Sequence, residues 1–127
     1  MKRKFNVSIM GIGGVGGRMA SLLHKINSKN DGGELFDIRL FGRSNSPHTE
    51  YIKHNGLSIY NIEKQSTLNL KFETCDSIEK KEGRIDDLII LAIKSFHIDC
   101  ILPQLHNIMN ENSLLLTLQN GINTKCV

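Results

Sequence analysis

The sequence lacks any apolar run long enough to cross a bilayer. Its longest uninterrupted apolar run, residues 88–93, is far shorter than the roughly 20 residues that a transmembrane helix needs. The basic residues at positions 2–4 are followed by an apolar stretch that Asn6, Ser8 and five glycines interrupt, so the hydrophobic core of a signal peptide is missing. We therefore expect a soluble, cytoplasmic protein with no membrane partner.

A strong imbalance of charge is also missing. The formal net charge is +3 over 127 residues, and the basic residues are scattered except at positions 2–4. Nucleic-acid-binding domains gather Lys and Arg on one face or along one helix, and the sequence has no such stripe. We therefore expect no nucleic-acid partner. The length fits a single domain, residues 1–127, that can bury a real core.

Cysteine is scarce, and the spacing of the cysteines suggests no pairs. Cys75, Cys100 and Cys126 are odd in number, lie far apart and form no C-x-x-C motif. This usage suits a reducing compartment and argues against a disulfide framework. His97 and Cys100 stand three residues apart in a predicted helix, but the neighbourhood offers too few further ligands for a metal ion. We expect no metal site.

Glycine, in contrast, is concentrated near the amino terminus at the spacing of a dinucleotide-binding loop. Gly11, Gly13 and Gly16 form G-x-G-x-x-G between a predicted strand, residues 6–10, and a predicted helix, residues 15–26. The first glycine permits a tight turn, the second lets a pyrophosphate approach the backbone, and the third lets helix and strand pack closely. The phosphates would bind the free amides of the helix N-terminus. The alternative, a glycine-rich surface turn, is disfavoured because both flanks fit the motif.

Apolar periodicity predicts alternating strands and helices along the rest of the chain. The loop over residues 27–33 should end the first helix, and Pro103 should kink or restart the last one. Parallel strands are expected over residues 6–10, 37–41, 88–93 and 114–118, two short antiparallel strands over 57–62 and 68–72, and helices over 15–26, 48–54 and 98–109. This order predicts an α/β fold, a doubly wound parallel sheet with a small antiparallel β insertion.

In such a sheet the ligand lies beyond the carboxyl ends of the strands, so residues that follow strands are the candidates for chemistry. Arg43 follows the second strand, where an NAD enzyme would have an acidic residue for the ribose hydroxyls. A guanidinium there offers a bidentate partner for a 2′-phosphate, which favours NADP. Lys94 and Asn120 follow the two later strands. Taken alone, Arg43 and Lys94 could be ordinary exposed side chains, and Asn120 with Gly121 could be only a turn.

Together these positions resemble the amino-terminal, NADP-binding domain of ketopantoate reductases. The resemblance spans nearly the whole chain, and its most particular parts are the lysine after one strand and the Leu-Gln-Asn-Gly after the next. The matching segments are Gly11-Ile12-Gly13-Gly14-Val15-Gly16, Leu40-Phe41-Gly42-Arg43, Asn55-Gly56-Leu57, Asp87-Leu88-Ile89-Ile90-Leu91-Ala92-Ile93-Lys94 and Leu118-Gln119-Asn120-Gly121.

The resemblance implies a Rossmann-like domain and NADPH-dependent reduction of 2-dehydropantoate to pantoate, in the route to pantothenate and coenzyme A. It implies that the glycine loop holds the pyrophosphate and that Arg43 holds the 2′-phosphate. It also implies that Lys94 lies beside the cofactor and the approaching substrate, and that Asn120 contacts both the nicotinamide ribose and the substrate. The implied cofactor-binding set is Gly11, Ile12, Gly13, Gly14, Val15, Gly16, Arg43, Lys94 and Asn120.

Two departures from the family pattern shape the remaining expectations. The connection over residues 27–35 is longer than is usual in the family, and the chain stops at Val127, before the helical domain that supplies the family's general-acid lysine and further substrate-binding residues. We therefore expect a cofactor-binding fragment that carries no catalytic residue, lacks the helical substrate domain and is inactive alone. Two alternative functions stay open: a reductase of another 2-keto acid, and a nucleotide-sensing module without catalysis. Assembly into a homo-oligomer also stays open.

Overall fold

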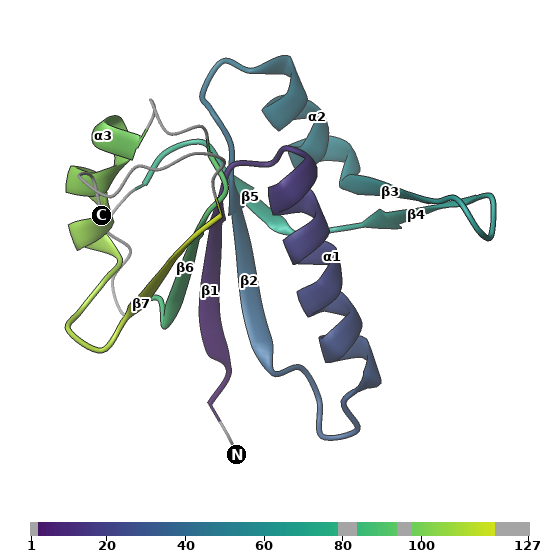
Figure 1. Ribbon diagram of the computed structural model, residues 1–127, viewed down its shortest axis with the longest axis horizontal. Helices are drawn as coiled ribbons and strands as arrows, with labels where there is room; N and C mark the ends of the chain where they lie inside the picture. The colour runs from purple at the N-terminus through teal and green to yellow at the C-terminus, as the bar shows by residue number, and fades with distance from the viewer. Residues whose placement is uncertain (1–2, 79–83, 94–97, 119–127) are drawn as a thin grey trace.

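The computed structural model describes residues 3–78, 84–93 and 98–118 and shows a parallel five-stranded sheet with helices on both faces (Figure 1). The strand order is β5-β2-β1-β6-β7, and every neighbouring pair is parallel. The strands of this sheet are β1 (Phe5–Met10), β2 (Phe36–Phe41), β5 (Glu73–Cys75), β6 (Leu88–Leu91) and β7 (Leu114–Thr117).

The order of the strands reverses between β1 and β6, as it does in a doubly wound sheet. Helices α1 (Gly14–Lys29) and α2 (Pro47–Asn55) lie on one face, and α3 (Ile98–Ile101) with the 3-10 helix η2 (Leu102–Asn107) lies on the other (Figure 1). A separate antiparallel pair, β3 (Leu57–Asn61) and β4 (Ser66–Leu70), follows α2. The predicted fold class, with its antiparallel insertion, is thus confirmed.

Two hydrophobic clusters fill the space on either side of the sheet. Alternate residues of each strand face opposite ways, so β1 contributes Val7 and Ile9 to one cluster and Met10 to the other. The first cluster joins the sheet to α1, α2 and β3 through Ile12, Ala20, Ile38, Leu40, Ile52, Leu57 and Ile90. The second joins it to η2 through Phe41, Ile89, Leu91, Leu105 and Ile108. As predicted, β6 is buried on both faces.

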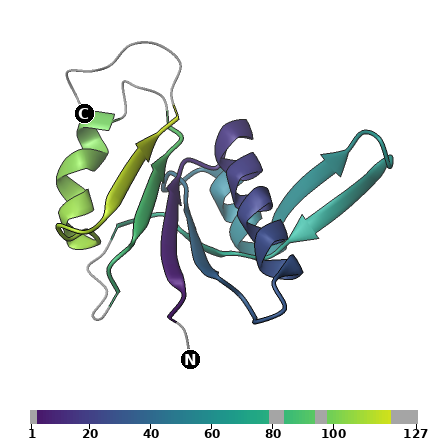
Figure 2. The same ribbon diagram turned by 60° about the horizontal axis from the view of Figure 1, so that its bottom comes forward.

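The β3–β4 hairpin projects away from the sheet (Figure 2). Its base is buried, since Leu57 pairs with Leu70 and each is no more than 7% exposed. Towards the turn the apolar side chains reach solvent, and Ile62 is 80% exposed. Gln65 completes the turn with a φ of 49°.

Three details differ from the sequence-based expectations. The first helix continues to Lys29, so the prediction that a loop begins at residue 27 is wrong. Asn27 stays in the helix because its side chain is buried, where Oδ1 accepts hydrogen bonds from the amides of Leu35 and Phe36, each at 2.9 Å. Strand β5 was not predicted. The predicted helix over residues 98–109 is a single α-turn followed by a 3-10 helix around Pro103, which confirms the local cost of that proline.

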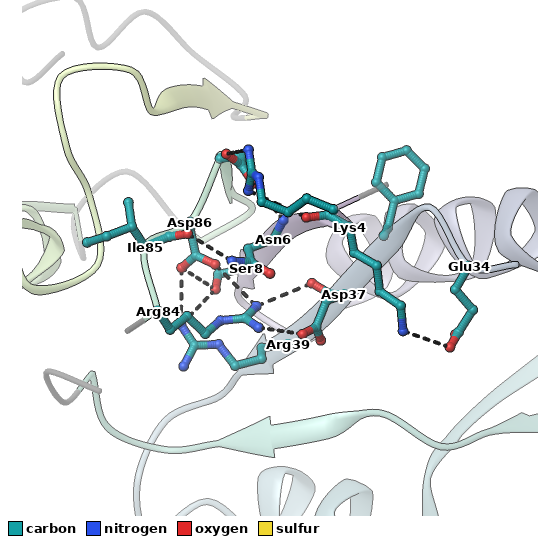
Figure 3. A network of polar contacts seen from close by, with 12 residues as sticks. Lys4, Asn6, Ser8, Glu34, Asp37, Arg39, Arg84, Ile85 and Asp86 are labelled. Carbon is teal, nitrogen blue, oxygen red and sulfur yellow. Dashed lines mark hydrogen bonds and ion pairs between the residues drawn. The ribbon is translucent and has the colours of Figure 1, made fainter. Parts of the chain in front are cut away.

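A polar network lies around Asp86, where β1, β2 and the segment before β6 meet (Figure 3). Asp86, just before β6, is fully buried and accepts hydrogen bonds from Ser8 Oγ at 2.7 Å and Arg39 at 3.1 Å. Its other carboxylate oxygen accepts from Arg84 at 3.2 Å, and Arg84 also pairs with Asp37 at 2.8 Å. These hydrogen bonds and ion pairs join β1, β2 and the segment that leads into β6.

None of the helices in the described part of the chain is both long and apolar enough to span a membrane.

Candidate cofactor site at the carboxyl edge of the sheet

The carboxyl ends of the central strands meet at one edge, directly before the glycine loop. The Gly11 amide donates to the Phe41 carbonyl at 2.8 Å, which joins the end of β1 to the end of β2. On the other side of β1 the Ala92 amide donates to the Met10 carbonyl, also at 2.8 Å. The edge therefore brings the chain after β1, β2 and β6 to the point where the strand order reverses.

Gly11 and Gly16 are required by the packing of this loop. Gly11 has a φ of 102°, and a Cβ there would lie 2.7 Å from the Ala92 carbonyl oxygen. A Cβ on Gly16 would overlap the Gly11 carbonyl oxygen. The first glycine thus permits the turn, and the third lets α1 approach the end of β1, as the spacing predicted.

Gly13 and Gly14 differ from the other two because they face open space. No heavy atom lies within 4 Å of a Cβ built on either residue, and both are exposed. Gly13 has a φ of −89° and a ψ of −161°, which any residue adopts. Nothing in the described fold explains a glycine at position 13, whereas the close approach of a ligand to the backbone would.

The N-terminus of α1 is suited to an anion. Gly13 is its N-cap and offers no side chain, and the first turn carries no acidic residue. The first hydrogen bond within the helix runs from the Gly17 amide to the Gly13 carbonyl at 2.8 Å, so the amides before it are not used by the helix. Val15 in the same turn is 53% exposed. These amides and the helix dipole can bind a pyrophosphate.

Arg43 lies in the exposed loop between β2 and α2, two residues after the end of β2. Its side chain makes no ion pair or hydrogen bond with any residue in the described ranges. No acidic residue lies between Phe41 and the start of α2 at Pro47. The guanidinium is therefore available to a ligand at this edge.

The first turn of α2 contacts the glycine loop directly. His48 Nε2 lies 2.8 Å from the Ile12 carbonyl oxygen. Next to it, Thr49 is 2% exposed, and a Cβ on Gly42 would overlap Thr49 Oγ1 and lie 3.0 Å from Ile12 Cδ1. Our sequence-based reasoning missed His48. In the sequence His48 is only a polar residue in the first turn of a predicted helix. Its partner Ile12 lies 36 residues earlier, so no local pattern points to the contact.

Lys94 and Asn120, the candidate substrate residues, lie outside the described residues. The strands before them end at the same edge, β6 at Leu91 and β7 at Thr117, where the Leu118 amide donates to the Leu91 carbonyl at 2.9 Å. The roles of these two side chains stay predictions.

Other features of the described residues do not compete with this site. Within those residues no group of three or more His, Cys, Asp or Glu side chains could hold a metal ion. A cavity of about 220 Å³ lies near the start of β2 instead, at the opposite edge of the sheet, and its lining includes Lys4, Glu34, Phe36 and Asp37.

Comparison with known proteins identifies the family. Residues 7–126 match the family model described as ketopantoate reductase PanE/ApbA. The chain belongs to the ketopantoate reductase family. The resemblance seen in the sequence is thereby confirmed.

This chain is much shorter than the family members that it matches. It is 31% identical over 116 residues to the 2-dehydropantoate 2-reductase of Lactococcus lactis subsp. lactis (strain IL1403), an alignment that covers 91% of this chain and 34% of that protein. The chain thus spans about a third of the length of this relative.

Solved structures agree on the fold. D-mandelate dehydrogenase with NADH and anilino(oxo)acetate is similar with a TM-score of 0.75 at 26% identity, over 95% of this chain and 35% of that one. The 2-dehydropantoate 2-reductase from Porphyromonas gingivalis W83 is similar with a TM-score of 0.74 at 21% identity, over 94% of this chain and 39% of that one. The family therefore includes oxidoreductases with a nicotinamide cofactor, which agrees with the predicted class of enzyme.

Proposed function

We propose that this chain is the NADP-binding domain of a reductase that converts 2-dehydropantoate to pantoate. Family membership supports the reaction, and the relative from Lactococcus lactis bears its name. The preference for NADP is inferred from Arg43 at the carboxyl edge. The cofactor supplies a hydride from the nicotinamide ring, and the protein supplies binding, orientation and electrostatics.

Arg43 is the single observation that carries the cofactor assignment. A dinucleotide whose pyrophosphate binds at the start of α1 places its adenosine ribose towards the end of β2. A carboxylate there would accept hydrogen bonds from the ribose hydroxyls and repel a 2′-phosphate, whereas a guanidinium binds the phosphate through charge-assisted hydrogen bonds. Arg43 is exposed, so it can make this contact without breaking another.

The described residues of the edge support binding of the pyrophosphate end of the cofactor. The open space at Gly13 admits the pyrophosphate close to the backbone, and the free amides of the first turn of α1 neutralise its charge. Lys94 and Asn120 follow the strands beyond β1, towards the nicotinamide end, and we propose that they hold the nicotinamide ribose and the 2-keto acid. Reduction also needs a proton donor for the developing alkoxide. We propose that a second, helical domain of a longer protein provides it.

One alternative has specific support, and a second has none. The solved structure of D-mandelate dehydrogenase contains NADH and anilino(oxo)acetate. A 2-keto acid other than 2-dehydropantoate is therefore the second candidate substrate. A nucleotide-sensing module without catalysis is the third hypothesis, and it gives no reason for a lysine and an asparagine after β6 and β7 in the sequence. Cytoplasmic location and assembly into a homo-oligomer stay predictions.

The test of the cofactor assignment is to titrate NADPH and NADH against the wild type and Arg43→Ala. Loss of charged hydrogen bonds worth about 1.5–3 kcal/mol should weaken NADPH roughly ten- to a hundredfold and leave NADH nearly unchanged. Lys25→Ala, on the exposed side of α1, removes a positive charge elsewhere and should change neither affinity. Equal losses of both cofactors in Arg43→Ala would contradict the 2′-phosphate assignment.

The test of the substrate is an assay of NADPH absorbance with 2-dehydropantoate. We expect the chain of 127 residues to bind NADPH but not to turn over, and a longer product of the same gene to do both. Removing a general acid alone lowers a rate by about a hundred- to ten-thousandfold. Turnover by the short chain at a comparable rate would show that this half carries the acid. Turnover of another 2-keto acid by the longer protein in place of 2-dehydropantoate would favour the second candidate.

A further inference from the structure

We propose that His48 is a positioning residue for cofactor binding, which holds the Ile12–Gly13 peptide so that the Gly13 amide faces the pyrophosphate. The inference rests on the proposed function, because it concerns the same dinucleotide site. It adds to that site a side chain that touches no part of the cofactor and acts through the backbone of the glycine loop.

The direction of the hydrogen bond follows from its partners. The Ile12 carbonyl oxygen can only accept, so His48 Nε2, 2.8 Å away, carries the proton and donates it. The neutral ring protonated at Nε2 and the imidazolium both satisfy this contact. The bond therefore fixes the tautomer of the neutral ring and leaves Nδ1 as its acceptor.

The geometry of the peptide carries the effect from Ile12 to Gly13. The Ile12 carbonyl and the Gly13 amide belong to one planar unit, and no peptide bond among the described residues is cis. In a trans peptide the C=O and N–H point in opposite directions. A carbonyl held towards α2 therefore turns the Gly13 N–H away from α2. This amide has no partner within the described part of the chain, and Gly13 faces open space.

The loop benefits from such a restraint because a glycine follows this peptide. Rotation of the Ile12–Gly13 plane changes φ of Gly13, and glycine tolerates φ values that other residues avoid, so Gly13 itself does little to fix the plane. The reversed plane would present a carbonyl oxygen to the phosphate and repel it. The hydrogen bond from His48 selects the orientation that binds before the ligand arrives, which lowers the entropy lost on binding.

Helix α2 can impose this orientation because it is firmly anchored. Thr49 and Ile52 are 2% and 3% exposed, and Ser46 caps the helix by accepting from the Thr49 amide at 3.5 Å. The backbone of His48 is therefore fixed relative to the sheet. His54 on the same helix provides the contrast. Both histidines are exposed, but the side-chain contact of His54 is with Glu50 one turn earlier and not with the glycine loop.

The experiment compares three variants of the full-length protein. His48→Phe keeps a ring of similar size without the donor, and His48→Gln restores an amide donor at the distance of Nε2. His54→Phe makes the same chemical change at an exposed position of α2 that does not contact the glycine loop. For each we would measure the Kd of NADPH and of NADH by titration, and the thermal midpoint without ligand.

His48→Phe should weaken NADPH and NADH by the same factor, about three- to tenfold for one hydrogen bond. His48→Gln should stay within about twofold of the wild type, and His54→Phe should have no effect. The equal loss distinguishes His48 from Arg43, whose loss should be selective for NADPH. Rescue by Gln distinguishes a donor from a ring that only fills space.

Two results would overturn the inference while leaving the proposed function standing. One is wild-type affinity in His48→Phe, and the other is an equal loss in His48→Phe and His48→Gln. Failure of the wild type to bind either cofactor would instead overturn the proposed function, and the inference with it. Should His48→Phe not fold, ¹⁵N NMR of the wild-type ring decides, because protonation of Nδ1 alone would exclude the donated bond.

Discussion

Replacing Gly16 by alanine is expected to destabilise the fold even when no ligand is present. The added Cβ would overlap the Gly11 carbonyl oxygen and lie 3.0 Å from the Gly11 carbonyl carbon and 3.4 Å from Ala92 Cβ. The first two are backbone atoms, and Gly11 is itself held by a hydrogen bond to the Phe41 carbonyl. The clash can therefore be relieved only by moving α1 away from β1.

The expected cost follows from the size of this shift. Overpacking by one carbon in a close-packed site costs about 1–3 kcal/mol, and the better helix propensity of alanine returns at most about 1 kcal/mol. For a chain of this length each kcal/mol lowers the thermal midpoint by roughly 3–6 °C. We therefore expect Gly16→Ala to melt several degrees below the wild type.

Gly13→Ala is the matched comparison, three positions earlier. Nothing lies within 4 Å of its added Cβ, so the change in stability should stay within about 0.5 kcal/mol. Under the proposed function this variant should lose affinity for NADPH and NADH, because the methyl group occupies the space of the pyrophosphate. Thermal denaturation without ligand, followed by titration of both cofactors, measures the two effects separately. Equal stability of Gly16→Ala and the wild type, or an equally destabilised Gly13→Ala, would refute the reasoning.

Two further predictions concern the ion pairs of Asp86 and Asp87, just before β6. Asp86→Ala should lower the free energy of unfolding by about 3–5 kcal/mol, because it leaves the guanidinium groups of Arg39 and Arg84 without their shared carboxylate. Urea denaturation measures this loss. An unchanged midpoint would contradict the prediction. The hydrogen bond from Arg3 lowers the pKa of Asp87 below its ordinary value. The stability that this carboxylate contributes is therefore complete above its unfolded pKa near 3.9 and is lost as pH falls through the lower folded value. The difference in thermal midpoint between the wild type and Asp87→Asn should thus shrink on acidification below about pH 4, and a constant difference would count against the pair.

The alternation of strands and helices and the glycine loop could be predicted because their signals are local. The loop at residues 11–16 stands between an apolar strand and an amphipathic helix, and each glycine is defined by its immediate neighbours. β6 is a continuous apolar run, which is typical of a strand covered on both faces. The packing of α1 against the sheet then follows from the right-handed connection of parallel strands.

The features that were missed depend on distant partners. β5 has three residues, one charged and two of intermediate burial, and it is a strand because it pairs with Arg39 to Phe41 of β2. Asn27 is a poor helix former whose place in α1 is determined by the amides of the next strand. The contact of His48 with the glycine loop likewise exists only after the sheet has brought β1 and β2 together. No pattern in a short window of sequence contains this information.

The residues that hold the loop after β2 in place do not include Arg43, the residue that we expect to bind the 2′-phosphate of the cofactor. Gly42 packs against Thr49 and Ile12, and Ser46 caps α2, while Arg43 is exposed and unpaired among the described residues. An exchange at position 43 therefore disturbs none of the contacts that hold the loop. Under the proposed function, cofactor preference can drift during evolution by single replacements at no cost in stability, and one scaffold can serve reductases that draw on either nicotinamide pool of the cell.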